Sequence, residues 1–69
     1  MEKGWINIYN TEDQYRGDIA KELLEEQGIE SVIINHKDSS YLNFGEFEVY
    51  VREEHEELAR KILEQLIKG

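Results

Sequence analysis

The sequence has no cysteine and no proline among its 69 residues, and only 8 lysines and arginines against 16 aspartates and glutamates. Without cysteine the chain can form no disulfide, and it lacks the thiolate ligands that most structural zinc sites use. Without proline, no helix interior contains the residue that breaks helices most strongly. A domain of this size buries only about 60% of the surface that its unfolded chain exposes. Its stability must therefore come from helices packed on a sheet, or from self-association.

The excess of acidic residues gives the chain a formal net charge of −8. This charge repels nucleic acids and anionic membrane surfaces, because no local basic stripe opposes it. A basic protein surface is a compatible partner. No apolar run approaches the roughly 20 residues of a membrane span, and the first residues do not form a signal-peptide pattern. We expect a single soluble domain that covers residues 1–69 and works in the cytoplasm.

The apolar pattern divides the chain into three strands and two helices. Residues 5–9, 31–35 and 47–51 are short β-branched or alternating runs, which predict strands. Thr11, followed three residues later by Gln14, matches a capping box and predicts the start of the first helix. The pattern also predicts that this helix ends at a left-handed Gly28. A second helix should run from residue 53, where acidic residues suit a helix N-terminus, to residue 68.

Two seven-residue segments resemble each other, IAKELLE at residues 19–25 and LARKILE at residues 58–64. Their apolar residues recur at helical spacing, which predicts one apolar stripe on each helix. The predicted stripes comprise Tyr15, Ile19, Ala20, Leu23 and Leu24, and then Leu58, Ala59, Ile62, Leu63, Leu66 and Ile67. Both helices should lie on the same face of the sheet. The sequence thus predicts an α+β, ferredoxin-like β-α-β-β-α fold with a three-stranded sheet of order 1-3-2 and the fourth strand missing.

Few residues form a catalytic or metal-binding pattern. His36 lies near Asp38, but two candidate ligands do not make a metal site. No nucleophile-elbow motif surrounds Ser39 and Ser40, which are typical of a turn. The acidic run at residues 53–57 is typical of a solvated helix face. We therefore expect no enzyme activity, no metal site and no cofactor.

One face of the sheet is expected to stay open, because both helices cover the other. Strict alternation assigns to the helix-covered face Ile6, Ile8, Val32, Ile34, Phe47, Val49 and Val51. It assigns to the open face Trp5, Asn7, Tyr9, Ile33, Glu48 and Tyr50.

Aromatic residues on an open sheet face indicate an interaction patch, because Trp and Tyr are favoured anchors of protein interfaces. The predicted patch consists of Trp5, Tyr9, Ile33 and Tyr50. Alternatively, these rings only pair with one another across the sheet. The first strand is also a free edge, at which a second copy could pair to form a homodimer.

The segment at residues 37–45 offers a second candidate site. Tyr41, Leu42 and Phe44 are unusually apolar for a hairpin loop. They either fold back over the core as a lid or form a recognition loop. As a recognition loop, this segment would contact a protein partner. As an alternative function, the chain is a small-molecule sensor, in which His36, Tyr41 and Phe44 bind a ligand. The pocket would be framed by this loop and the start of the second helix.

Four short motifs resemble those of a known family. They are ELLEEQGIE at residues 22–30, VIIN at 32–35, EVYV at 48–51 and ARKIL at 59–63. Together they resemble a small bacterial family described as putative prokaryotic signal-transducing proteins. The resemblance implies a ferredoxin-like fold, similar to that of nitrogen-regulatory signalling proteins, and a role in signal transduction. It implies no catalytic residues, so the predicted function is a non-enzymatic protein-binding or regulatory module.

Overall fold

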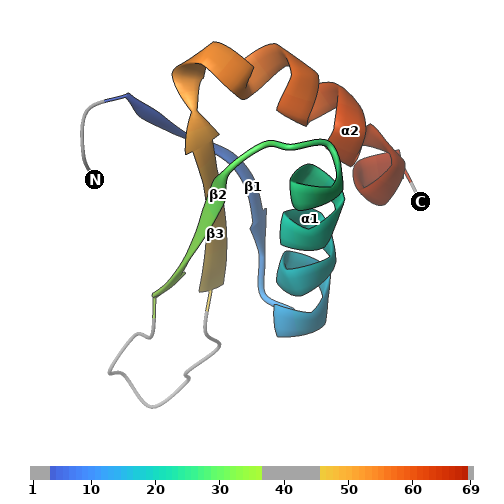
Figure 1. Ribbon diagram of the computed structural model, residues 1–69. Coiled ribbons are helices and arrows are strands. Elements are labelled where there is room, and N and C mark those ends of the chain that lie inside the picture. The colour runs from blue at the N-terminus through green and yellow to red at the C-terminus, as the bar shows by residue number, and fades with distance from the viewer. Residues whose placement is uncertain (1–3, 37–45, 69) are drawn as a thin grey trace.

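A computed structural model describes residues 4–36 and 46–68 of the chain. The elements in order are β1 (Trp5–Thr11), α1 (Gln14–Glu26), β2 (Ser31–His36), β3 (Glu46–Arg52), the short 3₁₀ helix η1 (Glu53–His55) and α2 (Glu56–Lys68). The three strands form one antiparallel sheet in the order β1-β3-β2 (Figure 1). The predicted α+β fold and its strand order are therefore confirmed. The predictions made for Tyr41, Leu42 and Phe44 fall outside the described residues.

Both helices pack on the same face of the sheet, and the core lies between them and the strands (Figure 1). The core residues with no exposed surface are Ala20, Leu24, Val49, Val51, Ala59 and Leu63. Four of these are the alanines and leucines at equivalent positions of the two similar segments, Ala20 with Leu24 and Ala59 with Leu63. The similarity between the segments thus reflects a shared way of packing each helix on the sheet.

The apolar stripes are narrower than the sequence predicts. Tyr15 is 71% exposed on α1, while Leu58 and Ile67 are 49% and 64% exposed on α2. The prediction that these three side chains pack on the sheet is wrong. Each helix contacts the sheet along one line of residues spaced three or four apart, so apolar residues beside that line stay in solvent.

The start of α1 also differs from the predicted capping box. The N-cap is Asp13, whose Oδ1 accepts a hydrogen bond from the backbone N–H of Tyr15 at 3.0 Å. Thr11 lies two residues before this N-cap, and its Oγ1 accepts a hydrogen bond from the backbone N–H of Asp13 at 3.1 Å. Aspartate caps a helix as well as threonine does, and a sequence window with both leaves the choice open.

The end of α1 agrees with the prediction. Gly28 has φ +76°, a left-handed conformation that favours glycine. Its N–H donates to the carbonyl of Glu25, and the N–H of Ile29 donates to that of Leu24, both at 2.9 Å. These two bonds form a Schellman motif, which turns the chain from α1 into β2 and buries Ile29.

The second helical segment begins with η1 rather than with a regular α-helix. The N–H of Glu53 donates to the carbonyl of Gly4 at 2.8 Å, which fastens η1 to the start of β1. His55 is half-buried, and its Nδ1 is enclosed without a hydrogen-bond partner in the described part of the chain. The acidic run is therefore not a uniformly solvated face, as the sequence had indicated.

Replacing Gly17 with alanine should stabilise the fold by about 1 kcal/mol, because glycine is the poorer helix former by that amount. Gly17 is buried in α1, and an added Cβ would lie 3.6 Å from the Cβ of Phe47 and 4.0 Å from the Cδ1 of Ile33. These are ordinary van der Waals distances, so the methyl group fits without displacing its neighbours. Urea unfolding curves of Gly17→Ala and the wild type measure the difference.

The matched control for this prediction is Gly28→Ala. It makes the same chemical change where the backbone is left-handed, and it should lower stability by about 1 kcal/mol. A Gly17→Ala protein that is less stable than the wild type would show that α1 packs on the sheet more tightly than described.

Candidate interaction face

The register of the sheet decides which side chains share a face. Residues directly opposite each other in an antiparallel pair project to the same side. Val49 of β3 is paired with Tyr9 of β1 and Ile33 of β2, and Val49 is fully buried under the helices. The neighbouring residue Tyr50 is paired with Asn7 and Val32, and this row projects away from the helices.

The prediction for the faces of β2 is therefore wrong. Ile33, expected on the open face, packs against the core instead. Val32 and Ile34, expected under the helices, are paired with Tyr50 and Glu48 and lie on the open face. Three consecutive β-branched residues have no polar alternation to mark their inner face, so only the register with β3 determines it.

The predicted position of Tyr9 on the open face is also wrong, and a β-bulge is the cause. The register between β1 and β3 shifts between Asn7 and Tyr9, so Ile8 is an extra residue on β1. After the bulge, Tyr9 is paired with Val49 and packs against the core. A bulge changes the alternation of every residue that follows it.

We define the open face by its residues from the three strands. It comprises Trp5, Asn7, Asn10, Val32, Ile34, Glu46, Glu48, Tyr50 and Arg52. Trp5 and Tyr50, two of the four predicted patch residues, do lie there, and both are half-buried. Their role in binding stays a prediction. Among the described residues, no helix or strand lies over this face (Figure 1).

Polar contacts hold the large side chains of the open face in place. The guanidinium of Arg52 lies 4.7 Å from the centre of the Trp5 ring, and its Nε donates to Glu30 Oε1 at 3.1 Å. Such a cation–π contact is worth about 0.5–1 kcal/mol at an exposed site, and an exposed ion pair adds little. The main effect of these contacts is to restrict the rotamers of Arg52 and Trp5.

Tyr50 is oriented in a similar way. Its hydroxyl donates a hydrogen bond to Glu48 Oε1 at 2.9 Å. That hydrogen bond, with smaller contributions from burial and from the negative charge of Glu48, raises the pKa of Tyr50 above its usual value. The phenol is therefore protonated at neutral pH and can donate this hydrogen bond.

The loop-based alternative has little support from the described residues. His36 ends β2 opposite Glu46, which begins β3, while η1 starts at the other end of β3. A strand of seven residues spans roughly 20 Å, so the ends of the loop and the start of the second helix are far apart. The side chain of His36, with Tyr41 and Phe44, lies outside the described residues.

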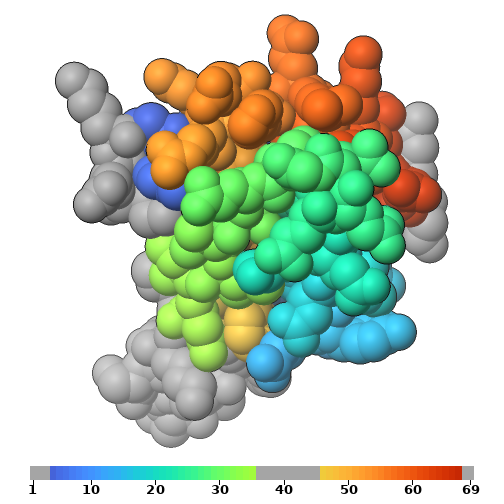
Figure 2. Space-filling view, in the orientation of Figure 1, coloured from blue at the N-terminus to red at the C-terminus, as the bar shows by residue number. Residues whose placement is uncertain are grey.

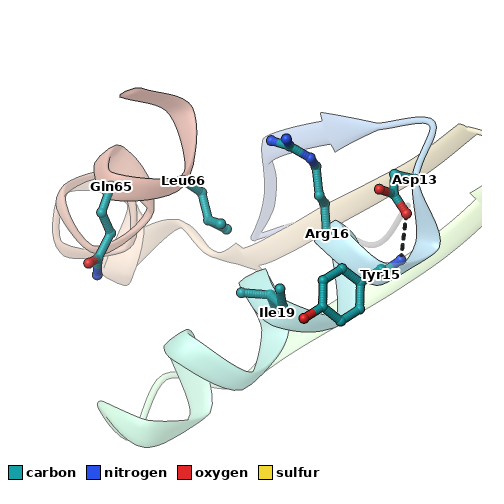
Figure 3. A pocket seen from close by; sticks show the side chains of 6 residues that line it. All are labelled: Asp13, Tyr15, Arg16, Ile19, Gln65 and Leu66. Carbon is teal, nitrogen blue, oxygen red and sulfur yellow. Dashed lines mark hydrogen bonds between the residues drawn. The ribbon is translucent and has the colours of Figure 1, made fainter. Parts of the chain in front are cut away.

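The structure contains a groove that the sequence did not predict. It lies between the first turns of α1 and the last turn of α2 and has a volume of about 390 Å³. Its lining residues are Asp13, Tyr15, Arg16, Ile19, Gln65 and Leu66. Figure 3 shows Ile19 and Leu66 pointing toward one another from the two helices. The exposed Tyr15, which the sequence assigned to the core, could have been the signal for this groove.

A smaller hollow of about 280 Å³ lies where β1 meets the second helical segment. It is lined by Gly4, Arg52, Glu53 and Glu54. Within residues 4–36 and 46–68, no three histidine or acidic side chains come together as a metal site. None of the helices described is both long enough and apolar enough to cross a membrane.

Comparison with models of known protein families gives a match over most of the chain. A family model described as "Putative prokaryotic signal transducing protein" matches residues 5–67, which include every described strand, all of α1 and all but the last residue of α2. Searches of curated proteins and of solved structures gave no match.

Proposed function

This chain belongs to the family of putative prokaryotic signal transducing proteins, and we propose that it acts as a non-enzymatic module that binds another protein through its open face. One observation carries the proposal. Trp5, Tyr50, Val32 and Ile34 lie together on a sheet face that no described helix covers. Large contiguous apolar patches are rare on the surfaces of monomeric proteins. Where they occur, they usually mark an interaction site.

The composition of the open face fits protein binding. Trp and Tyr contribute most to binding energy when they sit at the centre of an interface and are surrounded by polar residues. Here Tyr50 lies on the central strand β3, while Asn7 and Asn10 lie on the β1 side. Because Arg52 and Glu48 already hold the two aromatic rings, little side-chain entropy is lost when a partner binds.

The charge of the chain indicates the kind of partner. A net charge of −8 attracts a partner with a basic rim and accelerates its association. The proposal involves no catalysis, metal or cofactor, and it places the module in the cytoplasm, since nothing in the sequence requires an oxidising compartment. Self-association, the other partner expected from the sequence, would use a strand edge rather than this face.

Truncating the aromatic residues of the open face should weaken the binding of the partner at least tenfold, as expected for anchor residues. Proteins from cells that produce this chain are captured on the immobilised wild type and identified. Their dissociation constants are then measured for the wild type, Trp5→Ala and Tyr50→Ala. Circular dichroism confirms that each variant is folded.

The matched control is Tyr15→Ala, which removes an exposed aromatic ring from the helix side of the molecule. This variant should bind the partner like the wild type. A partner that binds all variants equally, or that is lost only with Tyr15→Ala, would exclude the open face as its binding site.

Small-molecule binding is the second candidate function, and the groove beside α1 is the observation that favours it. A volume of about 390 Å³ lies at the small end of the usual range for ligand sites. A ligand held there would raise the melting temperature of the wild type but not of Tyr15→Ala. Trp5→Ala would respond to that ligand like the wild type, which separates the two candidate functions.

A further inference from the structure

The two edges of the sheet differ in how well they are protected against pairing with another strand. The edge strand β1 contains the bulge at Ile8, and the side chain of Asn7 donates to the carbonyl of Val49 at 3.2 Å within it. Bulges twist an edge strand away from a partner. The edge strand β2 has no such feature, because its six residues pair with β3 in unbroken register from Ser31 to His36.

The described residues also leave the outer edge of β2 available. In the described part of the chain, no backbone group outside β3 is hydrogen-bonded to it. Figure 2 shows β2, in light green, at the surface on the viewer's side, with α1 beside it. An edge strand that is regular, β-branched and unpaired is a template for a further strand.

The distribution of charge indicates what pairs with this edge. Proteins usually protect an exposed edge with charged residues, but β2 contains no Asp, Glu, Lys or Arg. The sheet's charged residues lie on the central strand β3, which contains Glu46, Glu48 and Arg52. The acidic residue that directly precedes β2 in the sequence, Glu30, is paired with Arg52 at 3.1 Å. Two chains of charge −8 can therefore meet at β2 without placing like charges opposite each other.

We infer that β2 pairs antiparallel with β2 of a second copy of this chain. The dimer has a continuous six-stranded sheet of order β1-β3-β2-β2-β3-β1, in which identical strands pair about a two-fold axis. Val32 and Ile34 of both copies then lie side by side and extend the apolar part of the open face. The inference concerns a backbone edge, so it holds even if the open face binds no other protein.

The expected dimer is weak, because a six-residue edge buries less area than a standard interface. We expect a dissociation constant on the order of 10 µM, typical of small interfaces. Sedimentation equilibrium over a concentration series from well below to well above this value measures the mass. The wild type should pass from one to two chains across the series.

Two matched lysine variants test which edge forms the dimer. Ile34 and Asn10 are both paired with Glu48 and lie on the same face, but at opposite edges of the sheet. Ile34→Lys should weaken the dimer at least tenfold, because it places two like charges in the apolar row that Val32 and Ile34 of both copies form along the new pairing. Asn10→Lys and Trp5→Ala should leave it within about twofold of the wild type, since neither residue lies near the β2 edge.

Amide hydrogen exchange provides a second test that needs no variant. Above the dissociation constant, outward-facing amides of β2 should gain protection, while those of β1 should not change. A wild type that stays monomeric throughout the series overturns the inference. So does a dimer that Asn10→Lys dissociates and Ile34→Lys does not, or one that protects amides of β1 instead of β2.

Discussion

Leu24→Ala should lower the free energy of unfolding by about 3 kcal/mol, within the usual range for a fully buried leucine. Leu24 has no exposed surface and belongs to the cluster that joins α1 to β3. A chain of this length is stable by only about 3–10 kcal/mol in total. The variant should therefore be close to unfolding at physiological temperature, and urea denaturation followed by circular dichroism measures the loss.

The matched control is Leu58→Ala, the same chemical change at a leucine that is 49% exposed on α2. It should cost less than about 1 kcal/mol, because about half of the surface of Leu58 is already in water. Equal losses for the two variants would contradict the described packing, in which only one of the two leucines belongs to the core.

The contrast between these leucines shows how far helical periodicity alone can predict the core. The similar segments at residues 19–25 and 58–64 correctly indicate two helices that pack alike, and their equivalent leucines, Leu24 and Leu63, are fully buried. Periodicity defines the centre of a stripe well, because the buried residues there recur every three or four positions. It does not define the width of the stripe, so Leu58 was placed in the core with them.

The faces of the strands were harder to predict than the strands themselves. β3 alternates between valines and polar or aromatic residues, and its buried Val49 and Val51 agree with the prediction. β2 contains Val32, Ile33 and Ile34 in succession, and its inner face follows from its pairing with β3. The local pattern of such a strand does not encode its long-range pairing. The predicted inner face of β2 is therefore shifted by one residue from the observed face.

The candidate site was predicted only in part for the same reason. Trp5 and Tyr50 were placed on the open face correctly because Trp5 precedes the bulge and Tyr50 lies on the well-alternating strand β3. Tyr9 follows the bulge and was placed on the wrong face. No proline or glycine marks this bulge in the sequence, so strict alternation gives no sign of it.

Asn7→Ala should destabilise the fold by about 2 kcal/mol, because one amide group makes several hydrogen bonds at the bulge. Asn7 Nδ2 donates to Asn10 Oδ1 at 2.8 Å, to the carbonyl of Val49 at 3.2 Å and, more weakly, to that of Tyr9 at 3.4 Å. Without the side chain, the carbonyls of Val49 and Tyr9, whose bonds to Asn7 are partly buried, lose this donor, and so does the exposed Oδ1 of Asn10. Urea unfolding measures the loss, and amides of β1 should exchange faster in the variant.

Asn35→Ala is the matched control, since Asn35 is exposed on β2 and the structure shows no side-chain hydrogen bond for it within the described residues. Its stability should stay within about 0.5 kcal/mol of the wild type, as for most surface substitutions. If the two asparagines cost the same, the Asn7 amide does not hold the bulge. The bulge would then follow from the burial of Ile8 alone, and it would still interrupt the edge of β1.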